Sequence, residues 1–152
     1  MEKFIQELGS HTDEPTKIML QNVYKHKVKF DNYKKKLIFC TWCSLFFFLI
    51  LFYYINYFIL KPYGTSADLM FSAIIADGFI YILIGFLIFL GGLGSHFKKK
   101  KEKHEKEYQD LRKEIVQKSH LLWRYPFDWE QRNEVFQKMK MEKDINLYHE
   151  NK

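Results

Sequence analysis

The sequence is poor in cysteine and lacks the short motifs that mark common enzyme families. Its two cysteines form the C-x-x-C pair Cys40 and Cys43, and no second pair exists to complete a four-cysteine zinc site. There is no phosphate-binding loop, no glycine-rich dinucleotide turn and no G-x-S-x-G. The histidines, which show neither H-x-x-x-H nor H-E-x-x-H spacing, are His11, His26, His96, His104, His120 and His149. We therefore predict that the chain is not an enzyme and holds no metal or cofactor.

Charge is also missing, from two long stretches. Residues 37–60 contain no charged side chain, and residues 69–94 contain only Asp77. At about 1.5 Å rise per residue, each stretch forms roughly 36 Å of helix, enough to cross a hydrocarbon core of about 30 Å. Neither stretch alternates polar and apolar faces as a helix in a soluble core does. The sequence predicts two transmembrane helices, at 37–60 and 69–94.

The segments around the first span predict how it begins and ends. The span is not typical of a signal peptide, because it begins only after residue 36, is too long, and lacks a small-x-small cleavage site. Residues 61–68 contain proline and glycine and are predicted to form an external turn. We expect Pro62 to stop the first helix and Ser66 to cap the second.

Lysine gathers beside the two spans. The lysines expected to contact anionic lipid headgroups are Lys34, Lys35, Lys36, Lys98, Lys99, Lys100 and Lys101. The connector holds only Lys61, so the positive-inside rule predicts that both termini are cytoplasmic. Each lysine near the bilayer surface contributes about 1 kcal/mol of attraction to such lipids. Because the net charge of +6 accompanies no nucleic-acid motif, we predict no nucleic-acid binding.

The polar flanks are predicted to continue both spans as helices. Residues 1–36 include an acidic helix start at Asp13, and residues 95–122 form a basic helix. In both flanks, mostly apolar positions alternate at spacings of four and three, and His26, His104 and Lys118 interrupt the pattern. The positions are Met19, Val23, His26, Phe30, Tyr33 and Leu37, then His104, Tyr108, Leu111, Ile115, Lys118 and Leu122. We expect an antiparallel coiled-coil stalk. The alternative is two amphipathic helices lying on the bilayer.

The last segment, 123–152, begins with an aromatic turn. Asp128 is the predicted N-cap of a helix, with Gln131 at the capping-box position and an end near Lys143. The aromatic residues have three candidate roles: packing this helix on the stalk, docking a partner, or anchoring at the membrane interface. The candidate docking residues are Trp123, Tyr125, Phe127, Trp129 and Phe136.

Asp77 is the single charged residue inside a predicted span. An ionised carboxylate at this depth costs at least about 2.5 kcal/mol, so a partner is expected. Tyr53 and Tyr54 fall at about the same depth in the first span, with Asn56 nearer the outer surface, and a phenol hydroxyl can donate to the carboxylate. These residues form a candidate intramembrane polar site. We expect a structural role rather than ion transport, because polar residues often hold membrane helices together.

Small residues form a second feature of the spans. Gly78, Gly85 and Gly92 recur every seven residues, which predicts a smooth stripe for close helix packing. The first span of the same chain is the expected partner, and a second copy of the protein is the alternative. Cys40 and Cys43 lie inside the first span, where inert core packing is expected.

The ending of the chain carries a family resemblance. Together with the double span and the aromatic turn, it comprises Arg132-Asn133-Glu134-Val135-Phe136, Met139-Lys140 and Asp144-Ile145-Asn146-Leu147-Tyr148-His149-Glu150. This order of features resembles the YpbF type, small uncharacterised two-span membrane proteins of Bacillus-type bacteria. The resemblance implies a bacterial plasma membrane location and nothing about activity.

The sequence thus predicts an all-α protein: a transmembrane helical hairpin with cytoplasmic helical extensions and a C-terminal helix. Two functions fit it. In the first, the chain is a membrane-anchored interaction or scaffold module that presents its C-terminal helix to a protein partner. In the second, it is a homo-oligomer that handles ions or protons through Asp77. The first predicts that Trp123 and Trp129 matter more than Asp77, and the second predicts the reverse.

Overall fold

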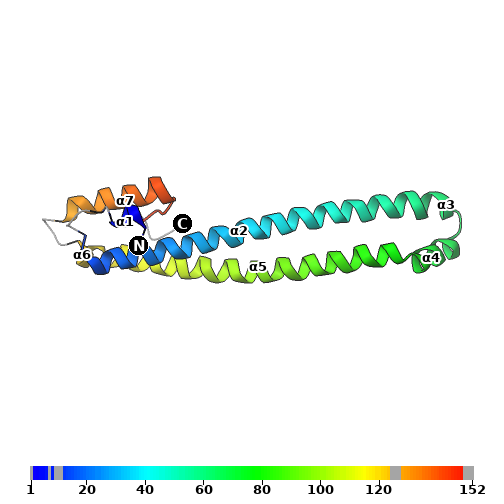
Figure 1. Cartoon of the computed structure of the whole chain (residues 1–152), viewed down its shortest axis with the longest axis horizontal. Coiled ribbons are helices and arrows are strands. Elements are labelled where there is room, and N and C mark those ends of the chain that lie inside the picture. Colours follow the sequence, from blue (N-terminus) through cyan, green and yellow to red (C-terminus); the bar gives the residue numbers. More distant parts are fainter. Residues whose placement is uncertain (1, 7, 9–11, 124–127, 149–152) are drawn as a thin grey trace. The chain divides into compact units, whose positions relative to one another are not determined.

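The computed structural model describes residues 2–6, 8, 12–123 and 128–148, and within these ranges it contains helices and no strand. The elements, labelled in Figure 1 where there is room, are α1 (Lys3–Gln6), α2 (Glu14–Ile55), the π-helix η1 (Asn56–Leu60), α3 (Lys61–Tyr63), α4 (Ala67–Ala76), α5 (Gly78–Gln117), α6 (Ser119–Leu122) and α7 (Trp129–Lys143). The prediction of an all-α fold is confirmed.

The chain divides into two compact units, which are described separately. The terminal unit comprises Met1–Asn32 and Lys100–Lys152, and the hairpin unit comprises Tyr33–Lys99. Helices α2 and α5 contribute residues to both units. The terminal unit is therefore assembled from the two ends of the sequence, whereas the hairpin unit is one continuous segment.

A buried apolar core holds the terminal unit together. Leu20 and Val23 of α2 and Ile115 of α5 are fully buried, and α7 adds Val135, Phe136 and Met139. The whole cluster is Ile5, Leu8, Leu20, Val23, Tyr108, Ile115, Trp123, Val135, Phe136, Met139, Ile145 and Leu147. Of the alternating positions predicted in the two flanks, Val23, Tyr108 and Ile115 lie in this cluster, which is expected of paired helices rather than of helices lying singly on a bilayer.

The predicted bounds of the C-terminal helix are confirmed. Asp128 occupies the N-cap position of α7 without a side-chain capping bond, and the helix ends at Lys143. Asp144 then adopts the left-handed conformation (φ 54°), which turns the chain so that the Ile145 N–H donates to the Met139 carbonyl at 3.1 Å. This C-terminal cap directs Ile145 and Leu147 back into the core, where both are fully buried.

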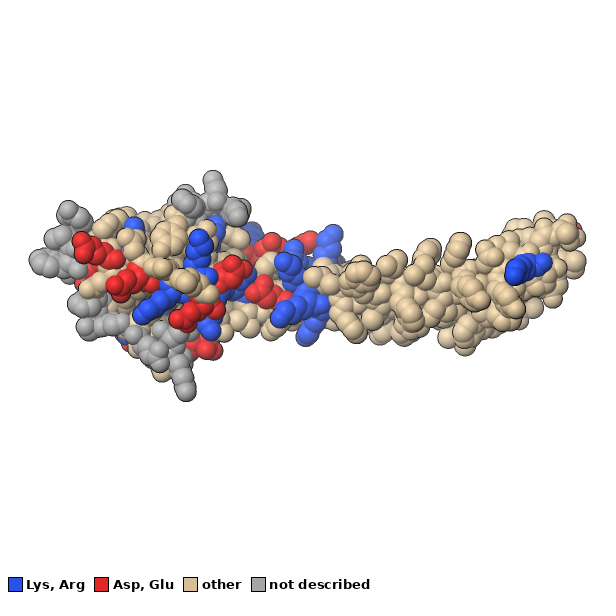
Figure 2. Space-filling model, turned by 90° about the horizontal axis from the view of Figure 1, so that it is seen from above, with Lys and Arg blue, Asp and Glu red and all other residues tan. Residues whose placement is uncertain are grey.

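The hairpin unit packs α2 against α5 along a narrow seam. The Cys40 thiol donates to the Leu90 carbonyl at 3.3 Å, and the rings of Phe47 and Phe86 are 4.5 Å apart. Most other large apolar side chains are exposed, as in Ile88 at 71%. Among the described residues, two helical stretches are long and apolar enough to cross a membrane, Glu14–Tyr63 and Gly78–Gln117. In Figure 2 a long tan surface, with one small blue patch near its end, runs along the apolar parts of these helices.

The connector differs from its prediction. Pro62 does not stop the first helix, because a π-turn at Asn56–Leu60 widens the backbone before it and α3 continues to Tyr63. The chain turns at Gly64, where a Cβ atom would lie 2.4 Å from the Leu60 carbonyl oxygen, so only glycine fits. Ser66 is the N-cap residue of α4 as predicted, but its side chain makes no capping bond.

Two predicted helices are each divided. The span predicted at 69–94 breaks at Asp77, whose extended backbone (φ −92°, ψ 100°) separates α4 from α5. The break occurs because the Asp77 carboxylate accepts a hydrogen bond from the Phe79 N–H and so begins a new helix. The helix predicted across 95–122 ends at Gln117, and after Lys118 the chain continues as α6.

Candidate functional site

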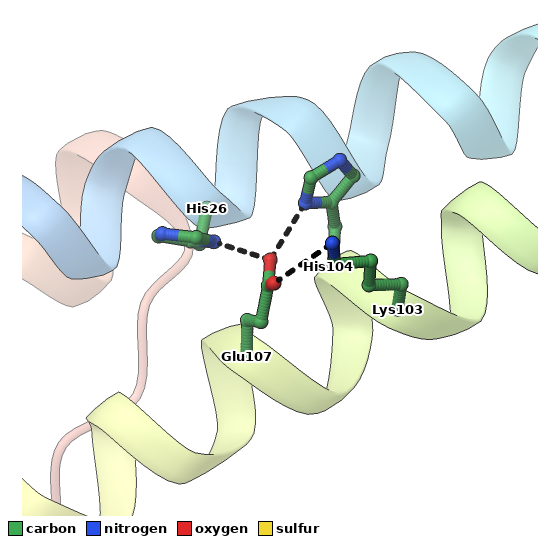
Figure 3. Close-up of polar contacts among 4 residues, drawn as sticks. All are labelled: His26, Lys103, His104 and Glu107. Carbon is green, nitrogen blue, oxygen red and sulfur yellow. Dashed lines mark hydrogen bonds and ion pairs between the residues drawn. The ribbon is translucent and has the colours of Figure 1, made fainter.

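Two histidines and a glutamate meet between α2 and α5 inside the terminal unit. His26 comes from α2, whereas His104 and Glu107 are three residues apart on α5 and therefore share one face of that helix. Figure 3 shows the three side chains pointing toward one another from the two facing helices. One imidazole or carboxylate atom of each residue lies within 4.8 Å of the others. We call this group the His–His–Glu cluster.

Both imidazoles of the cluster approach the same carboxylate oxygen. His26 Nδ1 lies 3.0 Å and His104 Nδ1 2.8 Å from Glu107 Oε2. An ionised carboxylate only accepts hydrogen bonds, so the His104 contact requires a proton on its Nδ1. His26 Nδ1 is buried, and among the described residues it has no partner with hydrogen-bond geometry. The two rings are 6.0 Å apart.

The electrostatics of the cluster favour an ionised Glu107. Burial raises the pKa of its carboxyl, but the hydrogen bond from His104 and the positive charges of His26, His104 and Lys103 outweigh burial, so the pKa is below its usual value. Lys103 Nζ is 3.8 Å from the other carboxylate oxygen, and its side chain is largely exposed. A carboxylate and two imidazoles are therefore held together beside the exposed ammonium group of Lys103.

Sequence reasoning missed this cluster, although a signal was present. His26 and His104 are two of the three polar residues, with Lys118, that interrupt the apolar patterns of the flanks. Pairing two such helices in antiparallel register brings polar seam positions together. Glu107 follows His104 by one helical turn. Spacing within one helix does not show which side chains of two helices meet.

The structure brings together part of the predicted intramembrane polar site. The Tyr54 hydroxyl donates to Asp77 Oδ2 at 2.7 Å, which is the donor role expected of a tyrosine at this depth. Tyr53 is 68% exposed and stacks on Tyr57 instead. Asn56 is exposed at the start of the π-helix. The site is thus a single Tyr54–Asp77 pair, and both carboxylate oxygens are occupied, since Oδ1 accepts from the Phe79 N–H.

The predicted docking role is corrected for two of its residues. Trp123 is fully buried, and its ring meets Phe136 edge-on at 5.5 Å inside the core of the terminal unit. Trp129 is half-buried, with the Arg132 guanidinium 3.8 Å from its ring. Tyr125 and Phe127 lie outside the described residues. Trp123 and Phe136 therefore pack α7 into the core, because large apolar side chains gain most free energy by leaving water.

The predicted glycine stripe does not pack closely against another helix. A Cβ atom built at Gly78, Gly85 or Gly92 would meet nothing within 4 Å. Gly94 is the glycine that approaches α2, with a built Cβ atom 3.9 Å from Cys40 Sγ. The seam between the helices thus follows the positions of Ile80, Leu83 and Leu90, which are buried, rather than the glycines. Cys40 is buried as expected, and both cysteines are free thiols.

The lysines expected at the lipid headgroups also make contacts within each unit. In the hairpin unit, Lys36 Nζ lies 5.4 Å from the centre of the Tyr33 ring. In the terminal unit, Lys101 pairs with Glu105 at 2.9 Å and lies 5.6 Å from the centre of the Phe30 ring. In Figure 2, blue side chains gather where the charged surface meets the uncharged one. In both units a lysine ammonium group thus lies near an aromatic ring.

Comparison with known proteins places the chain in a family. The family described as "Protein of unknown function (DUF2663)" matches residues 19–150. The chain is 38% identical over 152 residues to "Uncharacterized protein YpbF" of Bacillus subtilis (strain 168), and the similarity covers the whole length of both chains. No solved structure is significantly similar. The chain therefore belongs to the DUF2663 family, and its predicted resemblance to the YpbF type is confirmed.

Proposed function

We propose that this protein is a membrane-anchored interaction module of the bacterial plasma membrane. In this proposal the hairpin unit crosses the bilayer twice, and the terminal unit is a folded helical domain at the cytoplasmic surface that binds a protein partner. The observation that carries the proposal is the opposite treatment of apolar side chains in the two units. Large apolar side chains are mostly exposed in the hairpin unit, whereas in the terminal unit they form a buried core.

The exposed surface of the hairpin unit supports a lipid environment. Phe39, Ile82 and Ile88 are each about 70% exposed (71%, 69% and 71%). In water such a continuous apolar surface would drive aggregation, whereas lipid chains solvate it. The lysines at 34–36 and 98–101 support the cytoplasmic orientation of both ends and attraction to anionic headgroups.

The outer face of α7 is the proposed docking surface. Because Val135, Phe136 and Met139 point into the core, the opposite face of this helix is exposed. A hollow of about 550 Å³ lies on it, and Met141 is 76% exposed at its edge. The hollow is lined by Gln137, Lys140, Met141, Asp144 and Tyr148. A partner that inserts one apolar side chain among these polar groups fits this surface.

Ion or proton handling by Asp77 in a homo-oligomer is the less supported function. A transport group exchanges partners, but both Asp77 oxygens already accept bonds that hold the hairpin together, from Tyr54 and from the Phe79 N–H. Those bonds favour a structural role for Asp77.

The topology is tested by labelling cysteines in intact cells. In a chain whose native cysteines are replaced by alanine, we compare Thr65→Cys in the connector with Lys138→Cys on α7, both at exposed positions. An impermeant thiol reagent is expected to label position 65 directly and position 138 only after permeabilisation. Labelling of position 138 in intact cells, or protection of position 65, would overturn the proposed orientation.

The docking surface is tested by site-specific photocrosslinking. A photoreactive amino acid at Met141 is compared with one at Lys113, an exposed position on α5 of the same unit. We expect a discrete adduct with another protein from position 141 only. Equal adducts from both positions, or none from position 141, would contradict docking at the outer face of α7.

A further inference from the structure

We propose that the His–His–Glu cluster binds a divalent transition-metal ion, Zn²⁺ or a chemically similar first-row ion, which joins α2 to α5 within the terminal unit. The ligands are His26, His104 and Glu107. Nothing in the family description or in the relative's name assigns a metal to this protein. The proposal is independent of membrane topology and of the docking surface on α7.

The chemistry of the three side chains selects the class of ion. Two imidazoles and one carboxylate form a ligand set that first-row divalent ions prefer, whereas Ca²⁺ and Mg²⁺ prefer oxygen ligands alone. Sites with three protein ligands leave a further position for water, as sites of the His₂Glu type do in zinc enzymes. The absence of a cysteine from the cluster favours an ion that accepts nitrogen and oxygen ligands.

The spacing of the ligand atoms is close to that of a metal site. With bonds of about 2.0–2.2 Å, ligand atoms around a tetrahedral zinc ion are about 3.3 Å apart. Glu107 Oε2 is 3.0 Å from His26 Nδ1 and 2.8 Å from His104 Nδ1. Small side-chain rotations open these separations by a few tenths of an ångström, and the Glu107 side chain is 35% exposed and has room to rotate.

The poorly aligned contact of His26 is the second observation that points to a ligand. His26 Nδ1 is buried and lies 3.0 Å from Glu107 Oε2, but among the described residues no contact of this nitrogen has hydrogen-bond geometry. Such a buried polar atom costs free energy unless it is satisfied. Coordination to a metal ion uses its lone pair. Lys103 Nζ lies 3.8 Å from the other Glu107 oxygen, and its 66% exposed side chain can turn into solvent when an ion binds.

The structural alternative is a hydrogen-bonded cluster that sets the register of α2 against α5 without any ion. Polar residues in an otherwise apolar seam have this role in paired helices. The two interpretations differ in one measurable respect. A cluster that only sets the helix register needs no metal. A metal site binds one ion for each chain, and the folded protein is more stable with the ion than without it.

The experiment is metal titration of the full-length protein in detergent, purified with a tag that contains no histidine. Zn²⁺ binding is measured by calorimetry, and Co²⁺ binding by its visible absorption. The variants are His26→Gln, His104→Gln and Glu107→Gln, with His120→Gln as the matched control, because His120 is exposed in the same unit and outside the cluster. Circular dichroism checks that each variant is helical.

We expect the wild type and His120→Gln to bind one Zn²⁺ ion per chain, with a higher unfolding temperature when the ion is bound. Each cluster variant is expected to bind at least about 100-fold more weakly, since even residues behind the ligands contribute 10- to 100-fold. X-ray absorption of the zinc-loaded wild type is expected to show two imidazole ligands, which keeps the test decisive if a variant fails to fold. No zinc binding by the wild type, or equal binding by cluster and control variants, would overturn the proposal.

Discussion

Two tryptophans show how differently the two units treat the same side chain. Trp42 of the hairpin unit is 67% exposed, whereas Trp123 of the terminal unit is fully buried. In water, burying a large aromatic ring is among the most favourable contributions to folding, so an exposed ring in a long apolar helix implies a different solvent. The comparison indicates that the terminal unit is stabilised by removal of its side chains from water. In the hairpin unit most large apolar side chains stay exposed, and lipid is the solvent we propose for them.

The largest expected effect comes from the core of the terminal unit. Trp123→Ala removes a fully buried ring that packs edge-on against Phe136, and it should lower the free energy of unfolding by about 3–5 kcal/mol. Urea unfolding in detergent, followed by circular dichroism, measures the loss. Leu121→Ala is the control, because its side chain is 67% exposed and should change stability by no more than about 0.5 kcal/mol. Equal losses would contradict the distinction between core and surface.

A charge placed on each unit sharpens the comparison further. Ile88 in the hairpin unit is 71% exposed and Leu121 in the terminal unit 67%, so the two sites are matched in exposure and differ in the proposed solvent. Ile88→Arg should cost about 2.5–3.5 kcal/mol of membrane insertion, whereas Leu121→Arg should cost almost nothing. A glycosylation-based insertion assay measures both. Equal costs would show that both surfaces face the same solvent.

The smallest expected effect concerns the polar pair of the hairpin unit. Tyr54→Phe removes the hydroxyl that donates to Asp77 at 2.7 Å and should destabilise the hairpin by about 0.6 kcal/mol, the average for hydrogen bonds between membrane helices, and by no more than about 1.7 kcal/mol. Tyr53→Phe is the matched control one residue away, with a ring that is 68% exposed. Steric trapping of the hairpin in detergent measures both. Equal effects of the two variants would show that the Tyr54–Asp77 bond contributes nothing specific.

Features set by neighbouring residues could be predicted from the sequence. The helix start near Asp13 and the end of α7 at Lys143 were predicted from capping and composition, and α2 and α7 have these bounds. Tyr54 was one of two hydroxyls predicted at the depth of Asp77. The break at Asp77 was not predicted. A carboxylate in an apolar run indicates that its burial costs free energy, but it does not show that a hydrogen bond from the Phe79 N–H offsets this cost.

The sequence by itself determined the all-α class, the two long apolar helices and the family, because each depends on composition or local order along the chain. Only the tertiary structure decided that Trp123 belongs to the core, that the glycine stripe is open, and that His26 meets His104 and Glu107. Each of these depends on which faces of α2, α5 and α7 meet. Helix periodicity predicts that an apolar face is covered but not which residues cover it, since many registers bury similar area.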